Sequence, residues 1–261
     1  MVKDLKGKLV LLTGASSGLG PYIARRLDRE GCRFVLSARR QDELERVAVE
    51  LREARVVSAD LSQPGEAERL VAEAGPVDVL VANAGVPASG RLTDFEIDQI
   101  DRALDVNVRA PLVMARLLLP GMLERKDGHI VLMASLAGKV PAPRSSVYNA
   151  TKFGLRGFGH ALAAELRRTG VGVSVVSPTF VDEAGMFAES GARVPVRLTK
   201  PTQVADAVAR AILRRKVEIV VAPFEQRLFG RLVTAVPEMI QAAAGAAALP
   251  ENAIRAQEGK R

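Results

Sequence analysis

The regular alternation of short apolar runs with longer helical patterns is the feature that most constrains how this chain can fold. Short continuous apolar runs are typical of buried strands, and the longer segments between them have apolar residues at helical spacing. The predicted strands are Lys8–Thr13, Arg33–Ser37, Arg55–Ala59, Val77–Ala82, His129–Ser135, Val171–Ser177 and Glu218–Val221. The predicted helices are Leu19–Glu30, Gln41–Glu53, Pro64–Ala74, Phe95–Leu123, Ser146–Thr169 and Thr202–Arg214.

Repeated strand–helix units with continuously apolar strands indicate a parallel sheet that is covered by helices on both faces. Because crossovers between parallel strands are right-handed, the predicted fold is α/β, a doubly wound parallel sheet of the Rossmann type. A length of 261 residues fits one such domain, and no internal repeat or linker divides it. We expect this domain over residues 1–222 and a C-terminal amphipathic helical tail over residues 223–261.

Two segments break the alternation. Thr179–Thr199 has no clear periodicity and follows a strand end, and a loop of this length in a compact domain is usually functional, often a lid. Three roles are open for the tail: packing on its own domain, contact with a partner subunit, or peripheral contact with a membrane surface. Its apolar stripe at helical spacing consists of Leu228, Leu232, Val236 and Ile240.

Composition argues against several classes of function. The single cysteine, Cys32, permits no internal disulfide, and two histidines, His129 and His160, are too few for a histidine-based metal site, so we expect no metal. No apolar run reaches about 18 residues, so no transmembrane helix is predicted. No signal peptide precedes the first strand, which favours the cytoplasm. The net charge of +7 is dispersed among acidic residues, so we expect a solvated surface and no nucleic-acid binding.

Tyr148 and Lys152 are four residues apart in a predicted helix, which places them one turn apart on the same face. A neighbouring ammonium group favours the phenolate, so we expect Lys152 to lower the pKa of Tyr148 from its usual value of about 10. A tyrosine with such a pKa can transfer a proton near neutral pH. Because this spacing also occurs by chance on many helices, its meaning depends on the rest of the chain.

A glycine-rich turn, Gly14-Ala15-Ser16-Ser17-Gly18-Leu19-Gly20, joins the first predicted strand to the first predicted helix. Glycines permit a tight turn and let backbone N–H groups approach a pyrophosphate at the N-terminus of the helix. A turn in this position of a strand–helix–strand unit predicts a dinucleotide site.

The end of the second predicted strand, Ser37-Ala38-Arg39, lacks an acidic residue. An acid there would bond the adenosine ribose 2′-hydroxyl of NAD(H) and repel the 2′-phosphate of NADP(H). Ser37 offers a hydroxyl group, and Arg39 offers a guanidinium fork that suits a phosphate. We therefore predict NADP(H) in preference to NAD(H), the alternative being that Arg39 is an ordinary surface arginine.

Six motifs follow one another along the chain, and in this order and spacing they resemble the short-chain dehydrogenase/reductase family from about Lys6 to Val221. They are the glycine turn, Asn83-Ala84-Gly85 after the fourth predicted strand, Asn107, Ser135, Tyr148 and Lys152. The resemblance implies that residues 1–222 both bind a dinucleotide and catalyse a reaction. It also implies that the cofactor diphosphate and adenosine are held by Gly14, Ser16, Ser17, Gly18, Leu19 and Gly20.

The resemblance assigns further cofactor contacts to strand ends. Asp60, followed by Leu61 after the third predicted strand, would bond the adenine amino group. Asn83, Ala84 and Gly85 would steady the sheet and the adenosine ribose. Tyr148, Lys152, Pro178 and Val181 would complete the site at the nicotinamide end.

The resemblance also implies a catalytic tetrad of Asn107, Ser135, Tyr148 and Lys152. Tyr148 would be the general acid in carbonyl reduction and the base in alcohol oxidation. Ser135 would hydrogen-bond the substrate oxygen. Lys152 would lower the pKa of the tyrosine and bond the nicotinamide ribose, and Asn107 would hold a water that connects Lys152 to solvent.

The chain departs from the family pattern after the sixth predicted strand. Thr179 replaces the usual glycine, and Glu183 stands where the family has a threonine that contacts the nicotinamide amide. Two outcomes are open for this departure: an altered cofactor affinity, or a contact recovered by Thr179.

The function expected from these features is an NADP(H)-dependent oxidoreductase that interconverts a carbonyl and a secondary alcohol. Phe180, Met186 and Phe187 favour a hydrophobic small-molecule substrate, although core packing explains such residues equally well. One alternative is a 3-oxoacyl thioester reductase, and an alternative from another class is a non-catalytic NADP(H)-binding sensor or scaffold. The long helical segments resemble those that pair in family oligomers, so we expect a homo-dimer or homo-tetramer.

Overall fold

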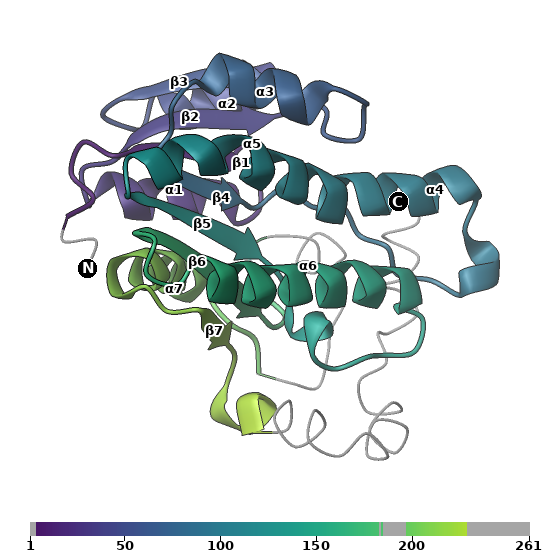
Figure 1. Cartoon of the computed structure of the whole chain (residues 1–261). Coiled ribbons are helices and arrows are strands. Elements are labelled where there is room, and N and C mark those ends of the chain that lie inside the picture. The colour runs from purple at the N-terminus through teal and green to yellow at the C-terminus, as the bar shows by residue number, and fades with distance from the viewer. Residues whose placement is uncertain (1–3, 183, 185–196, 229–261) are drawn as a thin grey trace.

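Seven parallel strands form one sheet in the computed structural model, which describes residues 4–182, 184 and 197–228 (Figure 1). The strands are β1 (Leu9–Thr13), β2 (Arg33–Ala38), β3 (Ala54–Ser58), β4 (Val79–Ala82), β5 (Gly128–Met133), β6 (Val171–Pro178) and β7 (Glu218–Val221). Their order across the sheet is β3-β2-β1-β4-β5-β6-β7. The chain therefore runs outward from β1 to β3, returns to the middle, and runs outward again from β4 to β7.

Seven α-helices of the described chain cover the sheet: α1 (Gly20–Asp28), α2 (Gln41–Ala48), α3 (Glu66–Ala74), α4 (Ile97–Leu104), α5 (Ala110–Glu124), α6 (Ser146–Glu165) and α7 (Pro201–Arg214). Apolar residues of α1, α2 and α7 form one core layer with one face of the sheet. Apolar residues of α3, α5 and α6 form a second layer on the other face. The predicted doubly wound parallel sheet of the Rossmann type is thus confirmed.

Continuous burial explains why the strands have no polar face. Every residue of β5 and β6 is buried, because helices cover both sides of these strands. Burying one Leu, Ile or Val side chain contributes about 1.5–3 kcal/mol. The strands that the alternation predicted are therefore the centre of the core.

The predicted single helix Phe95–Leu123 is wrong in its detail. The helical run begins at Ile97, and α4 and α5 are separated by η2 (Asp105–Arg109), a turn of π-helix closed by a bond from the backbone N–H of Ala110 to the carbonyl of Asp105. Apolar spacing identifies a helix but does not report one extra residue in a turn. The predicted helix Gln41–Glu53 likewise ends early, at Ala48.

By length and composition alone, the continuous run Ile97–Glu124 would suffice to cross a membrane. Its buried side chains instead pack in the second core layer, where Met114, Leu118 and Met122 lie against the sheet and its neighbours. We therefore describe it as a core helix of the domain.

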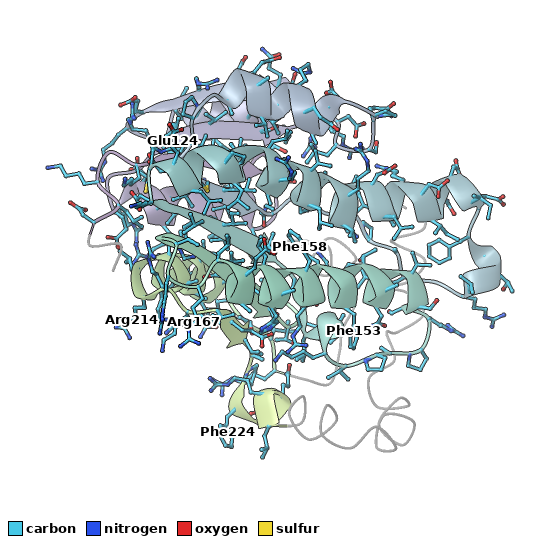
Figure 2. The ribbon with its side chains drawn as sticks, viewed as in Figure 1. Glu124, Phe153, Phe158, Arg167, Arg214 and Phe224 are labelled. Carbon is cyan, nitrogen blue, oxygen red and sulfur yellow. The ribbon has the colours of Figure 1, made fainter. Side chains whose placement is uncertain are left out.

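Only the beginning of the predicted tail lies within the described residues. A helical turn covers residues 224–228, in which the backbone N–H of Arg227 donates to the carbonyl of Pro223. Phe224 points outward at this end of the structure and is 70% exposed (Figure 2). The remaining residues of the predicted stripe and most of the predicted lid lie outside the described residues: Glu183, Met186, Phe187, Leu232, Val236 and Ile240.

Candidate active site

The glycine turn between β1 and α1 has a backbone that other residues cannot adopt easily. Gly14 and Gly18 have φ angles of 63° and 60°, in the left-handed region that favours glycine. A Cβ atom on Gly20 would collide with the carbonyl oxygen of Gly14, and one on Gly14 would lie 2.8 Å from the Cα of Ala84. The turn therefore requires these glycines for its shape and for its approach to the segment after β4.

The N-terminus of α1 is suited to an anion. The first turn of α1 contains no acidic side chain, and no side chain caps its backbone N–H groups. The N–H of Gly20 donates to the Ser17 carbonyl and Pro21 has no N–H, so the helix dipole is the main feature that favours a phosphate at this position. This fits the cofactor diphosphate that the sequence predicts.

Asn83 joins the carboxyl ends of β1 and β4. Its side-chain amide donates to the carbonyls of Thr13 and Gly14, at 3.1 Å each. In return, the Thr13 hydroxyl accepts from the backbone N–H groups of Asn83 and Ala84 at 3.1 and 3.0 Å. These bonds join β1 to β4 below the glycine turn. The strand order reverses at this point, which is where α/β proteins bind their ligands.

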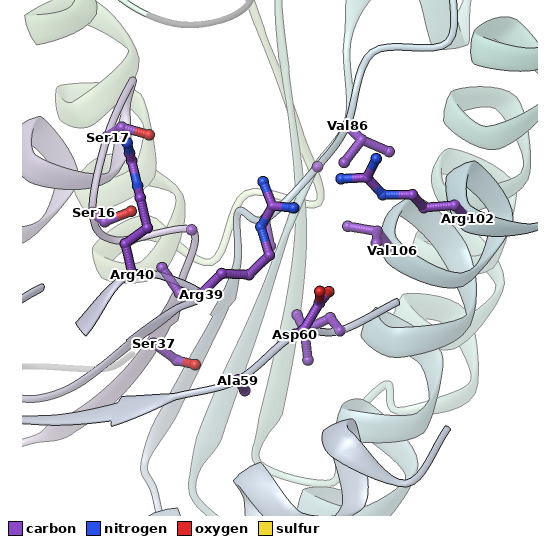
Figure 3. A pocket seen from close by; sticks show the side chains of 15 residues that line it. Ser16, Ser17, Ser37, Arg39, Arg40, Ala59, Asp60, Val86, Arg102 and Val106 are labelled. Carbon is purple, nitrogen blue, oxygen red and sulfur yellow. The ribbon is translucent and has the colours of Figure 1, made fainter. Parts of the chain in front are cut away.

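An open pocket lies over this point (Figure 3). It collects predicted cofactor residues from four segments: Gly14, Ser16, Ser17, Ser37, Arg39, Asp60, Leu61, Ala84 and Gly85. It also contains residues that the sequence did not single out: Ala38, Arg40, Ala59, Val86, Arg102 and Val106.

Charge and unpaired polar groups in the pocket fit an adenosine phosphate. Arg39 and Arg40 follow β2, and Arg102 enters from α4 and points toward Arg39 (Figure 3). The hydroxyl of Ser37 is buried without a hydrogen-bond partner in the described residues, so a ligand would satisfy it. Asp60 accepts from the backbone N–H and hydroxyl of Ser62, which fixes its orientation. The residues present therefore fit NADP(H).

Arg102 was missed because periodicity does not show how a helix is rotated against distant strands. It precedes Asn107, which the motif did identify, by five residues. Arg40 lies next to Arg39 and could have been found from the same strand-end argument.

The segment after β6 contains Thr179 and Val181, which the sequence assigns to the nicotinamide end of the site. Val181 packs in the first core layer and pairs with Thr199, so its side chain does not line the pocket. The Thr179 hydroxyl donates to the side-chain oxygen of Gln226 at 2.6 Å, a bond to the first turn of the tail. The hydroxyl of Thr179 therefore already has a hydrogen-bond partner within the protein. Several other predicted cofactor residues do not line the pocket: Gly18, Leu19, Gly20, Asn83 and Pro178.

Ser135, Tyr148 and Lys152 meet beyond the carboxyl end of β5. Ser135 caps the short helix η3 (Leu136–Gly138), and its hydroxyl accepts from the backbone N–H of Ala137 at 3.1 Å. Tyr148 and Lys152 lie one turn apart in α6, with Nζ of the lysine 5.6 Å from the centre of the phenol ring. The predicted shared helix face is confirmed.

The predicted lowering of the Tyr148 pKa is wrong in this structure. Burial raises the pKa of Tyr148 to about 12, although a hydrogen bond with Ser135 opposes the rise. Burial also lowers the pKa of Lys152 to about 8, and its Nζ donates to the carbonyl of Met133 at 3.0 Å. The sequence argument counted the attraction between the two groups and omitted the cost of burying both charges.

Asn107 is fully buried in η2 and binds the segment after β4. Its side-chain oxygen accepts from the backbone N–H of Val86 at 2.8 Å, and its amide donates to the Val86 carbonyl at 3.0 Å and to the Thr151 hydroxyl at 3.4 Å. Thr151 immediately precedes Lys152 in α6. Asn107 therefore lies between the pocket wall and α6.

The arrangement provides an anion-binding turn, a pocket with three arginines, and a buried proton donor held by a serine. No group of three or more His, Cys, Asp or Glu side chains that would hold a metal occurs in the described part of the chain. These features suit proton transfer to an oxygen beside a bound dinucleotide.

Comparison with known proteins agrees with this arrangement. The family model described as short chain dehydrogenase matches residues 8–195. A ketoacyl reductase of Nostoc sp., HetN, is 38% identical over 227 residues, which cover 83% of this chain and 79% of that protein. An uncharacterized oxidoreductase of Staphylococcus aureus is 34% identical over 81% of this chain and 94% of its own length.

Solved structures with a bound cofactor have the same fold. A metagenomic short-chain oxidoreductase in complex with NADP is 35% identical, with a TM-score of 0.71 over 84% of this chain and 98% of that one. An actinorhodin polyketide ketoreductase variant with NADPH is 34% identical, with a TM-score of 0.74 over 83% of this chain and 96% of that one. The chain belongs to the short-chain dehydrogenase/reductase family, and it is an oxidoreductase that acts on CH–OH or carbonyl groups.

Proposed function

We propose that this protein is an NADP(H)-dependent oxidoreductase that interconverts a carbonyl and a secondary alcohol, with Tyr148 as the general acid and base. The observation that carries the proposal is the meeting of Ser135, Tyr148 and Lys152 beyond β5, on the same edge of the sheet as the pocket that contains Arg39. When bound, the nicotinamide supplies or accepts the hydride. The protein then has to orient the reactants and move one proton.

Each polar group has a defined part in that proton transfer. Tyr148 holds its proton firmly, since burial raises its pKa to about 12, and donates it to the carbonyl oxygen during reduction. Ser135 donates a hydrogen bond to the same oxygen and stabilises the charge that develops there. Lys152, at present on the Met133 carbonyl, favours the phenolate that remains after transfer and binds the nicotinamide ribose. Asn107 holds the water that connects Lys152 to solvent.

Arg39 is the basis for proposing NADP(H) over NAD(H). It stands at the end of β2 with Arg40 and the unpaired hydroxyl of Ser37, and the described pocket has no acid at that strand end. The three groups together suit a 2′-phosphate, which a guanidinium can bind through two parallel hydrogen bonds. Complexes of the related structures with NADP and NADPH support the same cofactor.

A 3-oxoacyl thioester is the second candidate substrate class. The specific observation that favours it is the likeness to proteins named a ketoacyl reductase and a polyketide ketoreductase. A hydrophobic ketone is the first class, on the basis of Phe180 in the segment that follows β6. Both are small-molecule substrates.

The experiment that tests the function is NADPH turnover against a panel of ketones, aldehydes and 3-oxoacyl thioesters. Tyr148→Phe should abolish turnover with every substrate and leave NADPH binding intact. Tyr22→Phe is the matched control, because Tyr22 is the other tyrosine of the chain. Tyr22 belongs to α1 and packs against the first core layer. A protein that binds NADPH but turns over no member of the panel would be a sensor or scaffold.

We also propose a homo-dimer or homo-tetramer in the cytoplasm. Support comes from the exposed apolar side chains of Leu117 on α5 and Phe153 on α6, the latter visible on the outer side of its helix in Figure 2. A monomeric mass by light scattering would refute the oligomer. Recovery of the protein in a membrane or secreted fraction would refute the location.

A further inference from the structure

One carboxylate at the edge of the sheet gathers three basic side chains. Glu218 is the first residue of β7, and it accepts from Nζ of Lys139 at 2.9 Å and from Nε of Arg156 at 2.8 Å. A second nitrogen of Arg156 lies at 3.3 Å, and Nε2 of His160 also lies 3.3 Å from the carboxylate. The side chains of Glu218 and Lys139 are only 16% and 14% exposed, so water screens this cluster poorly.

The three basic residues come from the two segments that carry the proton-transfer groups. Lys139 follows η3, the short helix that Ser135 caps. Arg156 and His160 continue the spacing of Tyr148 and Lys152 along α6, at intervals of four residues, so all four lie along one side of the helix. Glu218 therefore contacts both segments from a third element, the edge strand β7.

The two segments also touch each other. A Cβ atom on Gly138 would lie 2.6 Å from the backbone oxygen of Lys152, so the loop after Ser135 rests directly on α6. The amide of Asn149 donates to the carbonyls of Ala137 and Val140 in that loop. These contacts join the loop to the helix, and the close approach of Gly159 to Val175 packs the helix on β6. The Glu218 cluster adds a charged contact from both segments to the next strand, β7.

We propose that Glu218 is a positioning residue that holds the Ser135 loop and the Tyr148 helix against β7, and thereby fixes the Ser135 hydroxyl relative to the Tyr148 hydroxyl. This inference rests on the proposed function, because it assigns a part to Glu218 through those two groups. Glu218 touches neither of them. Burial opposes its charge, yet the hydrogen bonds from Arg156 and Lys139 hold the pKa of its carboxyl below the usual value, so the cluster remains ionised at neutral pH.

Kinetics provide the first test. Glu218→Gln keeps the size of the side chain but leaves Lys139 and Arg156 without their counter-charge, so the loop and helix should separate from β7. Displacing reacting groups by about 1 Å can cost on the order of 100-fold in rate. We expect kcat to fall by about 10- to 100-fold in Glu218→Gln, with a much smaller change in the Kd for NADPH, because the pocket with Arg39 lies on the other half of the sheet. Glu218→Asp should recover part of the lost rate.

Asp127→Asn is the matched control. Asp127 also pairs with two cations, Lys8 at 2.7 Å and Arg215 at 4.0 Å, but it directly precedes β5, at the amino end of the strands. It should lower stability without a selective loss of kcat. Equal kcat values for Glu218→Gln and the wild type, or equal losses in Glu218→Gln and Asp127→Asn, would overturn the proposal.

A second measurement does not depend on turnover. The chain has two tyrosines and no tryptophan, so in a Tyr22→Phe background the intrinsic fluorescence reports Tyr148 alone. Adding Glu218→Gln should raise the quenching of this fluorescence by acrylamide, while Asp127→Asn should not. If acrylamide quenches the Glu218→Gln variant no more than the wild type, the positioning role is refuted, whether or not a substrate has been found. If quenching rises but the protein turns over no substrate, only the proposed function is refuted.

Two further variants separate the arms of the cluster and cover the case in which Glu218→Gln fails to fold. Lys139→Met releases the loop alone, and Arg156→Met releases mainly the helix. Each should reduce kcat by about 3- to 10-fold and raise the quenching of Tyr148 fluorescence. Wild-type values of both quantities in both variants would refute the proposal.

Discussion

The acid sensitivity of this protein should depend on one buried histidine. His129 lies in β5 with 1% of its surface exposed, and Nε2 donates to the hydroxyl of Ser174, 2.8 Å away. The Ser174 hydroxyl has its own acceptor, the carbonyl of Lys216 at 2.6 Å, which fixes these roles. Nδ1 has no partner in the described residues. Burial, aided by the charge of Arg215, lowers the pKa of His129 from 6.5 to about 3.

The size of the effect follows from linkage. The unfolded chain binds a proton at this histidine below a pH of about 6.5, and the folded protein does not until a pH of about 3. Stability is therefore full above pH 6.5 and falls as the pH is lowered toward 3. Each pKa unit is worth about 1.4 kcal/mol, so the loss is about 2 kcal/mol by pH 5 and about 4 kcal/mol by pH 3. The total free energy of unfolding of a typical protein domain is about 5–15 kcal/mol.

Urea unfolding at a series of pH values measures this loss. His129→Leu should lower stability at pH 7 but flatten the dependence between pH 7 and pH 5, because the histidine is then absent from both states. His160→Leu, which removes the other histidine of the chain, should keep the full dependence. The carboxylates titrate in all three proteins and cancel in the comparison. A wild type and a His129→Leu variant with parallel pH profiles would refute the reasoning.

Three further predictions concern the site. Arg39→Asp should reduce the preference for NADPH over NADH by about 10- to 100-fold, since a hydrogen bond to a charged group is worth about 1.5–3 kcal/mol; an unchanged ratio of kcat/KM values would count against the arginine. Gly159→Ala should lower the free energy of unfolding in urea by about 1–3 kcal/mol, because its Cβ would lie 2.5 Å from Val175. Gly157→Ala, on the open side of α6, should raise that free energy by up to about 1 kcal/mol. Similar values for the two variants would show that α6 does not need this close approach. In the reduction direction, kcat/KM should fall as the pH rises above the pKa of Lys152, which is about 8. In Lys152→Arg this fall should occur at a higher pH. A fall at the same pH in the variant and the wild type would contradict the prediction.

The parts of the fold that depend on local pattern could be predicted from the sequence. Continuous apolar runs identified every strand of the sheet, because buried parallel strands have no polar face. The glycine turn was found because Gly14 and Gly18 require left-handed backbone angles that few other residues tolerate. The shared face of Tyr148 and Lys152 follows from helix geometry alone.

Features that depend on packing between distant segments could not be predicted. The position of Arg102 in the pocket depends on how α4 is rotated against the ends of β2 and β3. The pKa of Tyr148 depends on burial, which the neighbouring residues in the sequence do not report. The Glu218 cluster joins residues 79 and 62 positions apart, so no local spacing reveals it.

The π turn η2 offers a way to test stability and activity separately. It contains one residue more than an α-helical turn, and Asn107 occupies the space that this residue creates. Removing Val108 would restore α-helical hydrogen bonding between α4 and α5 without changing which face of α5 meets the sheet. Such a shortened protein should melt at a higher temperature than the wild type and have lost its reductase activity. That result would mean that a single backbone insertion lowers the free energy of unfolding of the domain and is kept for the position of Asn107.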